Sequence, residues 1–198
     1  MAQYRRILIL FFHPLFHKSR VNKELLRSIA DLEGVQARIM YDLYPDFHID
    51  MKTEQEYLVQ HDIIIWQHPM YWYSSPSLLK EWIDIVLTHG FAYGKKGRAL
   101  EGKKVMSAIT VGGRRDIYHE DGARKYRIPQ ILVPFERTAA LCNMDYLPPF
   151  VVHGTHLLEA GGIGHAAEHY RRVIMKMRDD LPDEKLLKKH EYMNDIIT

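Results

Sequence analysis

The chain has 198 residues, 46% of them hydrophobic, which is enough for one well-buried core and short for two. Its 27 basic and 25 acidic residues leave a formal net charge of +2, too little to favour nucleic acid or an anionic membrane. The single cysteine, Cys142, excludes an internal disulfide and a thiolate zinc site, which fits a reducing, cytoplasmic location. We single out no metal-binding residues.

The opening segment MAQYRRILILFFHP resembles a signal peptide in placing arginines before an apolar run. The run from Ile7 to Phe12 is short, ends at His13-Pro14 and lacks a small-residue cleavage site, so it predicts a strand instead. No later apolar stretch approaches the roughly 20 residues that span a bilayer. A membrane role would therefore need a partner.

Strand and helix patterns alternate through the first part of the chain. Arg6 to Phe12 is an apolar run, typical of a strand buried on both faces of a parallel sheet. Val21 to Leu32 has helical spacing, and Gly34 would end that helix. Val35 to Leu43 alternates polar and apolar residues, which favours a second strand nearer an edge, and a short helix is expected from Thr53 to Gln60.

The alternation continues with a third strand from Ile63 to Trp66. The next helix would start with Ser75 as its cap and Pro76 at the first helical position, and would end near Gly90. The remaining predicted elements are a fourth strand from Lys103 to Thr110, a loop from Arg114 to Arg127, a helix from about Ile128 to Cys142, a fifth strand within Met144 to His153 that Pro148-Pro149 interrupts, and a last core helix from Ala166 to Arg178.

This order of elements predicts the α/β class. At this length it favours a flavodoxin-like three-layer fold with a parallel five-stranded sheet of order 2-1-3-4-5. Residues 1–181 would form this domain, and residues 182–198 would form a charged C-terminal tail. The tail is expected to be either a helical arm on a partner subunit or a frayed end.

Ligands of such sheets bind beyond the carboxyl ends of the strands, where the strand order reverses between the first and third strands. The loop after the first strand, HPLFHKSRVN, ends at a helix start and offers hydroxyl, amide, imidazole and cationic groups that suit a phosphate. It lacks GxGxxG and GxxxxGK[ST], which argues against a dinucleotide Rossmann site or a P-loop. A capped helix with a solvated loop is the alternative interpretation.

The loop after the third strand, HPMYWY, places three aromatic residues in a row. Exposed apolar patches are normally small or functional, so these side chains should pack on something flat, such as a flavin. A loop tucked into the core, or a dimer contact, is the alternative. After the fourth strand, Gly112-Gly113 would let backbone N–H groups approach a flavin near N1 and O2, and Tyr118 could add its phenol, although a glycine pair most often marks only a turn.

With these segments the chain resembles the NAD(P)H:quinone oxidoreductase family of flavodoxin-like proteins, and especially the ancillary subunits of glutathione-gated potassium efflux systems. The likeness runs from Ile7 to about Met177 and rests on HPLFHKSRVN, LYPDFHID, QHPMYWYSSPSLLKEWIDIVLTHGFAYG, the TVGG loop and PFERTAALCNM. It implies the following flavin contacts: His13, Ser19 and Asn22 on the phosphate side; Pro69, Met70, Tyr71, Trp72 and Tyr73 along the ring and ribityl chain; Thr110, Gly112, Gly113 and Tyr118 at N1 and O2.

Two departures from the animal quinone reductases qualify this resemblance. In those enzymes a histidine that follows the equivalent tyrosine is thought to assist proton or charge relay, and Arg124 occupies its position here. A guanidinium cannot shuttle a proton but could stabilise a flavin anion, so Tyr118 and Arg124 are the candidate catalytic residues. His119 would either substitute for the histidine or face solvent. The chain also lacks the extra loops that hold FAD in the animal enzymes, so FMN is preferred and FAD is the alternative.

The resemblance implies a flavin-dependent oxidoreductase that transfers hydride from NADPH or NADH to a quinone or similar electrophile in a ping-pong cycle. The alternative function is a regulatory ancillary subunit of a membrane potassium efflux antiporter, which would hold the protein peripherally at the inner face of the membrane. The family also implies a homodimer, in which Gly90 to Gly94 could complete a neighbour's pocket. A simple electron-carrier flavodoxin is less favoured, because such carriers are strongly acidic.

Overall fold

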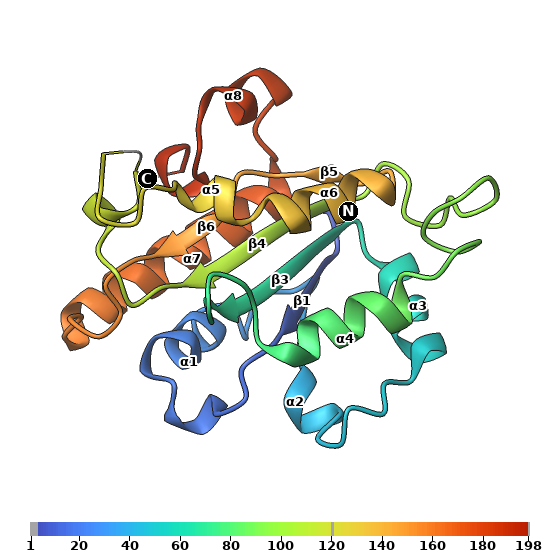
Figure 1. Cartoon of the computed structure of the whole chain (residues 1–198), viewed down its shortest axis with the longest axis horizontal. Coiled ribbons are helices and arrows are strands. Elements are labelled where there is room, and N and C mark those ends of the chain that lie inside the picture. The colour runs from blue at the N-terminus through green and yellow to red at the C-terminus, as the bar shows by residue number, and fades with distance from the viewer. Residues whose placement is uncertain (1–3, 120, 198) are drawn as a thin grey trace.

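The computed structural model of the chain describes residues 4–119 and 121–197; the start of the opening segment, residue 120 of the loop after the fourth strand, and the last residue of the tail lie outside this description. One parallel sheet forms the centre, in the order β2-β1-β3-β4-β5, and β6 also pairs with β4 (Figure 1). The strands are β1 (Ile7–Phe11), β2 (Val35–Ile39), β3 (Ile63–Pro69), β4 (Lys104–Thr110), β5 (Asp145–Tyr146) and β6 (Phe150–Val152). The predicted flavodoxin-like order is confirmed, with the fifth strand divided at its proline pair.

Helices cover both faces of the sheet and make three layers (Figure 1). Successive side chains of β1 point to opposite faces, so Leu8 and Leu10 join one core while Ile7 and Ile9 join the other. The helices are α1 (Arg20–Arg27), α2 (Met40–Leu43), α3 (Met51–Gln60), α4 (Ser77–Val86), α5 (Ile128–Ile131), α6 (Val133–Leu141), α7 (Ala160–Asp179) and α8 (Glu184–Lys189), with 3-10 turns η1 (Phe16–Lys18), η2 (Arg115–Ile117) and η3 (Met193–Asp195).

The first predicted helix is too long. α1 ends at Arg27, and its cap Ser28 bonds back to Leu25 through its hydroxyl at 2.8 Å. Turns then carry the chain to Gly34, whose φ of 78° lies in the left-handed region that glycine tolerates. Gly34 therefore ends a turn rather than a helix. The apolar residues Ile29 and Leu32 made the helix look longer in the sequence, because they are buried although they follow the end of α1.

The boundaries around the third strand also differ from the prediction. β3 continues to Pro69, so His68 and Pro69 belong to the strand and pair with Ile109 and Thr110 of β4. Ser75 does not cap the next helix: α4 begins at Ser77 with Pro76 as its flanking residue. Proline fixes only φ, and the ψ of 147° that the chain adopts at this residue keeps it outside the helix.

Two helices of the second half are divided or lengthened. The helix expected from Ile128 to Cys142 breaks at Leu132 into α5 and α6, because Pro134 has no N–H to continue the ladder. The last core helix begins at Ala160 rather than Ala166, through a glycine-rich stretch of weak helical propensity. Ile163 of this added segment is 5% exposed and packs into the core, which favours the longer helix.

The C-terminal tail is not a frayed end, whereas a helical arm on a partner subunit stays a prediction. The tail folds back on its own chain, where Leu187 and Met193 are buried. The Met193 N–H donates to the Pro149 carbonyl at 2.9 Å, next to the outer edge of β6. No helix in the described part of the chain is both long and apolar enough to cross a membrane.

Candidate functional site

The loops predicted to bind a ligand start at one edge of the sheet. Parallel strands β1, β3, β4 and β6 all end there, with Phe11 level with Gln67 and Thr110 level with both Pro69 and Val152. We call this the carboxyl edge. It contains the point between β1 and β3 where the strand order reverses, which is where open α/β sheets bind ligands.

A buried polar contact ties the first loop to the fourth strand. Ser19 caps α1 and accepts the Asn22 backbone N–H at 3.3 Å. The Asn22 side-chain amide, 2% exposed, donates to the Thr110 hydroxyl at 2.9 Å. Asn22 Oδ1 has no hydrogen-bond partner among the described residues. A buried acceptor without a partner suits a ligand that brings a hydroxyl donor, and the free N–H groups at the start of α1 suit a phosphate.

His13 lies where the loop after β1 approaches the loop after β3. Its Nδ1 accepts the Leu15 N–H at 3.1 Å, and its ring meets the Tyr71 ring edge-on at 6.4 Å between centroids. Burial lowers the pKa of His13 below its usual value, so the ring is neutral at physiological pH. His13 can therefore offer a ligand a hydrogen bond from Nε2, but not a positive charge.

The aromatic run forms a tight outward turn. Tyr71 and Ser74 exchange backbone hydrogen bonds of 3.1 and 2.9 Å, and between them Trp72 and Tyr73 adopt φ values of 51° and 58°. Bulky residues rarely adopt this left-handed conformation, and such strain clusters at functional sites. Trp72 is 94% exposed, so the alternative of a loop tucked into the core is wrong for this side chain.

The glycine pair after β4 lies close to side chains of its own loop and of the segment after β6. A Cβ on Gly112 would lie 2.7 Å from the His156 ring, and one on Gly113 would lie 2.6 Å from the Ile117 side chain and 2.8 Å from the Tyr118 ring. The glycines thus let these side chains approach the backbone closely. This close packing explains the glycines without a ligand, and their amides remain candidates for a ligand.

The two candidate catalytic residues lie on the loop that follows. Tyr118 is 8% exposed, and its pKa is raised mainly by burial, an effect that the nearby Arg124 charge partly offsets. Arg124 donates to the Tyr73 hydroxyl at 3.1 Å and so bridges to the loop after β3. His119 is exposed, as expected for a histidine that faces solvent.

Sequence reasoning missed two histidines beyond β6. The His153 ring lies 5.9 Å from the Tyr118 ring, and burial, with the Arg115 charge, lowers the pKa of His153 to about 4. His156 packs over Gly112. Both histidines belong to the run HGTH, which follows β6 directly. The position of this run at the carboxyl end of a strand could have indicated that they lie near the ligand site.

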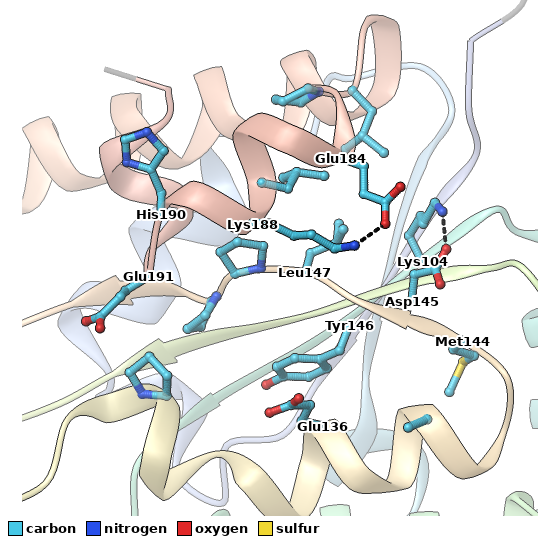
Figure 2. A pocket seen from close by; sticks show the side chains of 17 residues that line it. Lys104, Glu136, Met144, Asp145, Tyr146, Leu147, Glu184, Lys188, His190 and Glu191 are labelled. Atoms are coloured by element: carbon cyan, nitrogen blue, oxygen red, sulfur yellow. Dashed lines mark hydrogen bonds and ion pairs between the residues drawn. The ribbon is translucent and has the colours of Figure 1, made fainter.

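A cavity of about 730 Å³ lies elsewhere, between β5, α6 and the tail (Figure 2). Lys104, Asp145, Lys188 and Glu184 are among its lining residues, and Lys188 pairs with Glu184 at 2.5 Å. No predicted site residue lines this cavity. In the described ranges, no group of three or more potential ligands among His, Cys, Asp and Glu could hold a metal ion.

The chain is similar to proteins of known sequence and structure over most of its length. It is 44% identical, over 87% of this chain and 97% of the relative, to the glutathione-regulated potassium-efflux system ancillary protein KefF of Klebsiella pneumoniae (strain 342). A structure named as a thermophilic tryptophan halogenase from Streptomycin violaceusniger is 38% identical with a TM-score of 0.83, covering 89% of this chain and 99% of that one.

Two further structures carry names that bear on a ligand. General stress protein 14 of Treponema denticola, in complex with FMN, is 38% identical with a TM-score of 0.79, over 83% of this chain and 95% of that one. An NADPH-quinone reductase from P. pentosaceus is 31% identical with a TM-score of 0.76, over 84% and 96%. The model of the flavodoxin-like fold family matches residues 5–174, and with the expected strand order in place, this chain belongs to that family.

Proposed function

We propose that this protein is a flavin-dependent oxidoreductase that transfers hydride from NADPH or NADH, through bound FMN, to a quinone or similar electrophile. The observation that carries the proposal is the junction of three loops at the carboxyl edge. There the Asn22–Thr110 hydrogen bond joins the first loop to β4, and the Arg124–Tyr73 hydrogen bond joins the third loop to the second. The FMN complex and the NADPH-quinone reductase among the similar structures support the choice of cofactor and reaction.

The residues at this edge fit a flavin mononucleotide. Ser19, Asn22 and the N–H groups of α1 would hold the phosphate and ribityl side, and neutral His13 would add a hydrogen bond. Pro69, Met70 and the aromatic turn from Tyr71 to Tyr73 would contact the ring system, with Thr110, Gly112 and Gly113 at N1 and O2. The Met70 N–H already donates to the Thr110 carbonyl at 2.8 Å. The nitrogen atoms of the flavin ring would therefore need to accept hydrogen bonds from other backbone amides of the loop after β3.

The bound flavin would supply the two-electron chemistry, and the protein would supply binding, orientation and charge. Tyr118, whose pKa is raised, stays protonated at neutral pH and can donate a hydrogen bond to an oxygen that gains negative charge. Arg124 remains cationic and adds positive potential without moving a proton. A phenol donor beside a fixed cation favours the electron-rich form of a bound ring.

The test uses the purified protein. We expect a yellow protein that releases FMN, rather than FAD, on denaturation, and that oxidises NADPH or NADH when menadione is added. Tyr118→Phe should lower the rate of this oxidation about ten- to hundredfold, the effect of losing a hydrogen bond to a developing charge, while His119→Gln should leave it unchanged. A colourless protein that binds no added flavin and oxidises neither nucleotide would overturn the proposal.

We also propose a homodimer. Trp72 is almost fully exposed on the aromatic turn, and a large exposed aromatic next to a binding site suits a neighbouring subunit. In the segment from Gly90 to Gly94, Ala92 is fully buried in its own chain, so only the half-buried Phe91 and Tyr93 could reach a neighbour's pocket. A monomer in sedimentation at micromolar concentration would contradict this arrangement.

A second candidate function is regulation of a potassium efflux antiporter, which could coexist with catalysis. It is favoured by the 44% identity that spans nearly the whole of an efflux ancillary protein. In this role the protein would be cytoplasmic and reach the inner face of the membrane through its partner. Co-purification with the soluble domain of such an antiporter from the same host is the expected result, and failure to bind that domain would count against the role.

A further inference from the structure

The tail reaches beyond the part of the chain that matches the family, which ends at residue 174. Its last described segment is nevertheless well anchored. Met193 is fully buried, and the Asn194 side chain exchanges two hydrogen bonds with the backbone of Val151 in β6, at 2.8 and 3.2 Å. The tail thus has a fixed position beside the carboxyl edge.

From this position the tail holds both ends of the loop that carries Tyr118 and Arg124, which comprises residues 114–119 and 121–127. At the first end, Arg115 forms two parallel hydrogen bonds with Asp195, at 3.0 and 2.6 Å, and its guanidinium lies 4.8 Å from the centre of the Tyr192 ring. At the other end, Arg127 pairs with Glu191. Two-point attachment of this kind restricts a loop more than one contact does.

The contacts continue from the tail to Tyr118. The Tyr192 ring lies 6.1 Å from the His153 ring, which in turn lies 5.9 Å from the Tyr118 ring. Within the loop, the Arg124 N–H donates to the Ile117 carbonyl at 3.0 Å, so the two candidate catalytic residues are held beside each other. A displacement of either loop end would therefore move Tyr118 and Arg124 together.

We propose that Glu191, Tyr192 and Asp195 of the tail are positioning residues, which order the loop of residues 114–119 and 121–127 and so aim Tyr118 and Arg124 at the ligand of the carboxyl edge. The ordering of the loop rests on the contacts above. The consequence for a ligand rests on the proposed function. No tail residue needs to touch the ligand for this role.

The test compares Asp195→Asn with Asp31→Asn. Both variants remove the charge from an exposed, doubly hydrogen-bonded Arg–Asp pair, but the Asp31 pair with Arg171 joins the segment after α1 to α7, away from the loop. In Asp195→Asn we expect amides of residues 114–119 and 121–127 to exchange hydrogen about tenfold faster, with the rest of the chain unchanged. Asp31→Asn should exchange at the wild-type rate in this loop.

A second measurement follows the ligand. The Kd for FMN, read from quenching of flavin fluorescence, should rise at least about threefold in Asp195→Asn and stay constant in Asp31→Asn. Unchanged exchange in the loop, faster exchange through the whole chain, or faster loop exchange with an unchanged Kd would each overturn the positioning role. If the wild-type protein bound no flavin, the proposed function would fail, whereas the exchange comparison would still decide whether the tail orders the loop.

Discussion

At the scale of single residues, burial keeps several histidines neutral. His68 is fully buried in β3, where Nδ1 shares a 2.9 Å hydrogen bond with the Pro69 carbonyl and Nε2 has no partner among the described residues. Burial lowers the pKa of His68 from 6.5 to about 4. His68 directly precedes Pro69, the first residue of the segment predicted to contact the flavin. A charge on this ring would therefore destabilise the strand that supports the predicted flavin contacts.

The folded state should consequently lose stability in acid. The unfolded chain takes up a proton at His68 below pH 6.5, but the folded chain resists protonation until about pH 4, so stability that is present above pH 6.5 declines as the pH falls between these values. For His68 alone the loss at pH 5 is about 2 kcal/mol. The free energy of unfolding is measured in urea at pH 7 and at pH 5. Its decrease from pH 7 to pH 5 should be about 2 kcal/mol smaller in His68→Leu than in the wild type. Exposed His165→Leu is the control, and an equal acid loss in wild type and His68→Leu would contradict the prediction.

At the scale of elements, one buried carboxylate joins β2, α3 and α4. Glu54 of α3 is fully buried, pairs with Arg38 of β2, and accepts hydrogen bonds from the Tyr44 hydroxyl at 2.7 Å and the Trp82 indole at 3.0 Å. The Arg38 guanidinium also lies 3.9 Å from the centre of the Tyr57 ring. These contacts link α3 and α4 to β2, the strand at one edge of the sheet.

Removing this carboxylate should destabilise the fold strongly. Glu54→Leu would leave the Arg38 charge buried without its partner, and we expect the free energy of unfolding to fall by about 3–5 kcal/mol. The double variant Arg38→Met with Glu54→Leu should recover part of this loss, because it removes both charges. Denaturant unfolding measures both, with Lys80→Ala of the exposed Lys80–Asp84 pair as the control. A double variant as unstable as the single one would show that the charge is not the cause.

At the scale of the whole molecule, the tail closes an exposed edge of the sheet. β6 pairs with β4 on one side, and on its other side the Asn194 side chain meets the Val151 backbone N–H and carbonyl. The unpaired N–H and carbonyl groups of an edge strand can pair with a strand of another chain and so promote aggregation. A side chain that bonds to these groups blocks such pairing. The tail thus stabilises the sheet as well as the loop beside it.

Loss of this cover should lower stability and solubility together. Asn194→Ala removes two hydrogen bonds, and we expect the free energy of unfolding to fall by about 1–2 kcal/mol. Light scattering at high protein concentration should also rise, because the β6 edge becomes available to other chains. Lys189→Ala, an exposed change in α8, is the control. Unchanged unfolding and scattering in Asn194→Ala would mean that water replaces the asparagine without loss.

The alternation of strand and helix patterns, together with the chain length, predicted the strand order and the edge that carries the candidate site. The second strand was predicted too long, because Met40–Leu43 form the helix α2 instead of extending β2. Central strands must be apolar on both faces, as in β1 and β3, and the carboxyl ends of parallel strands meet at one edge. The cofactor-binding residues stay predictions. The outward aromatic turn and the docking of the tail depended on the folded chain, because the contacts that decide them join distant residues. Arg115 and Asp195 are 80 positions apart, and no local pattern indicates that they meet.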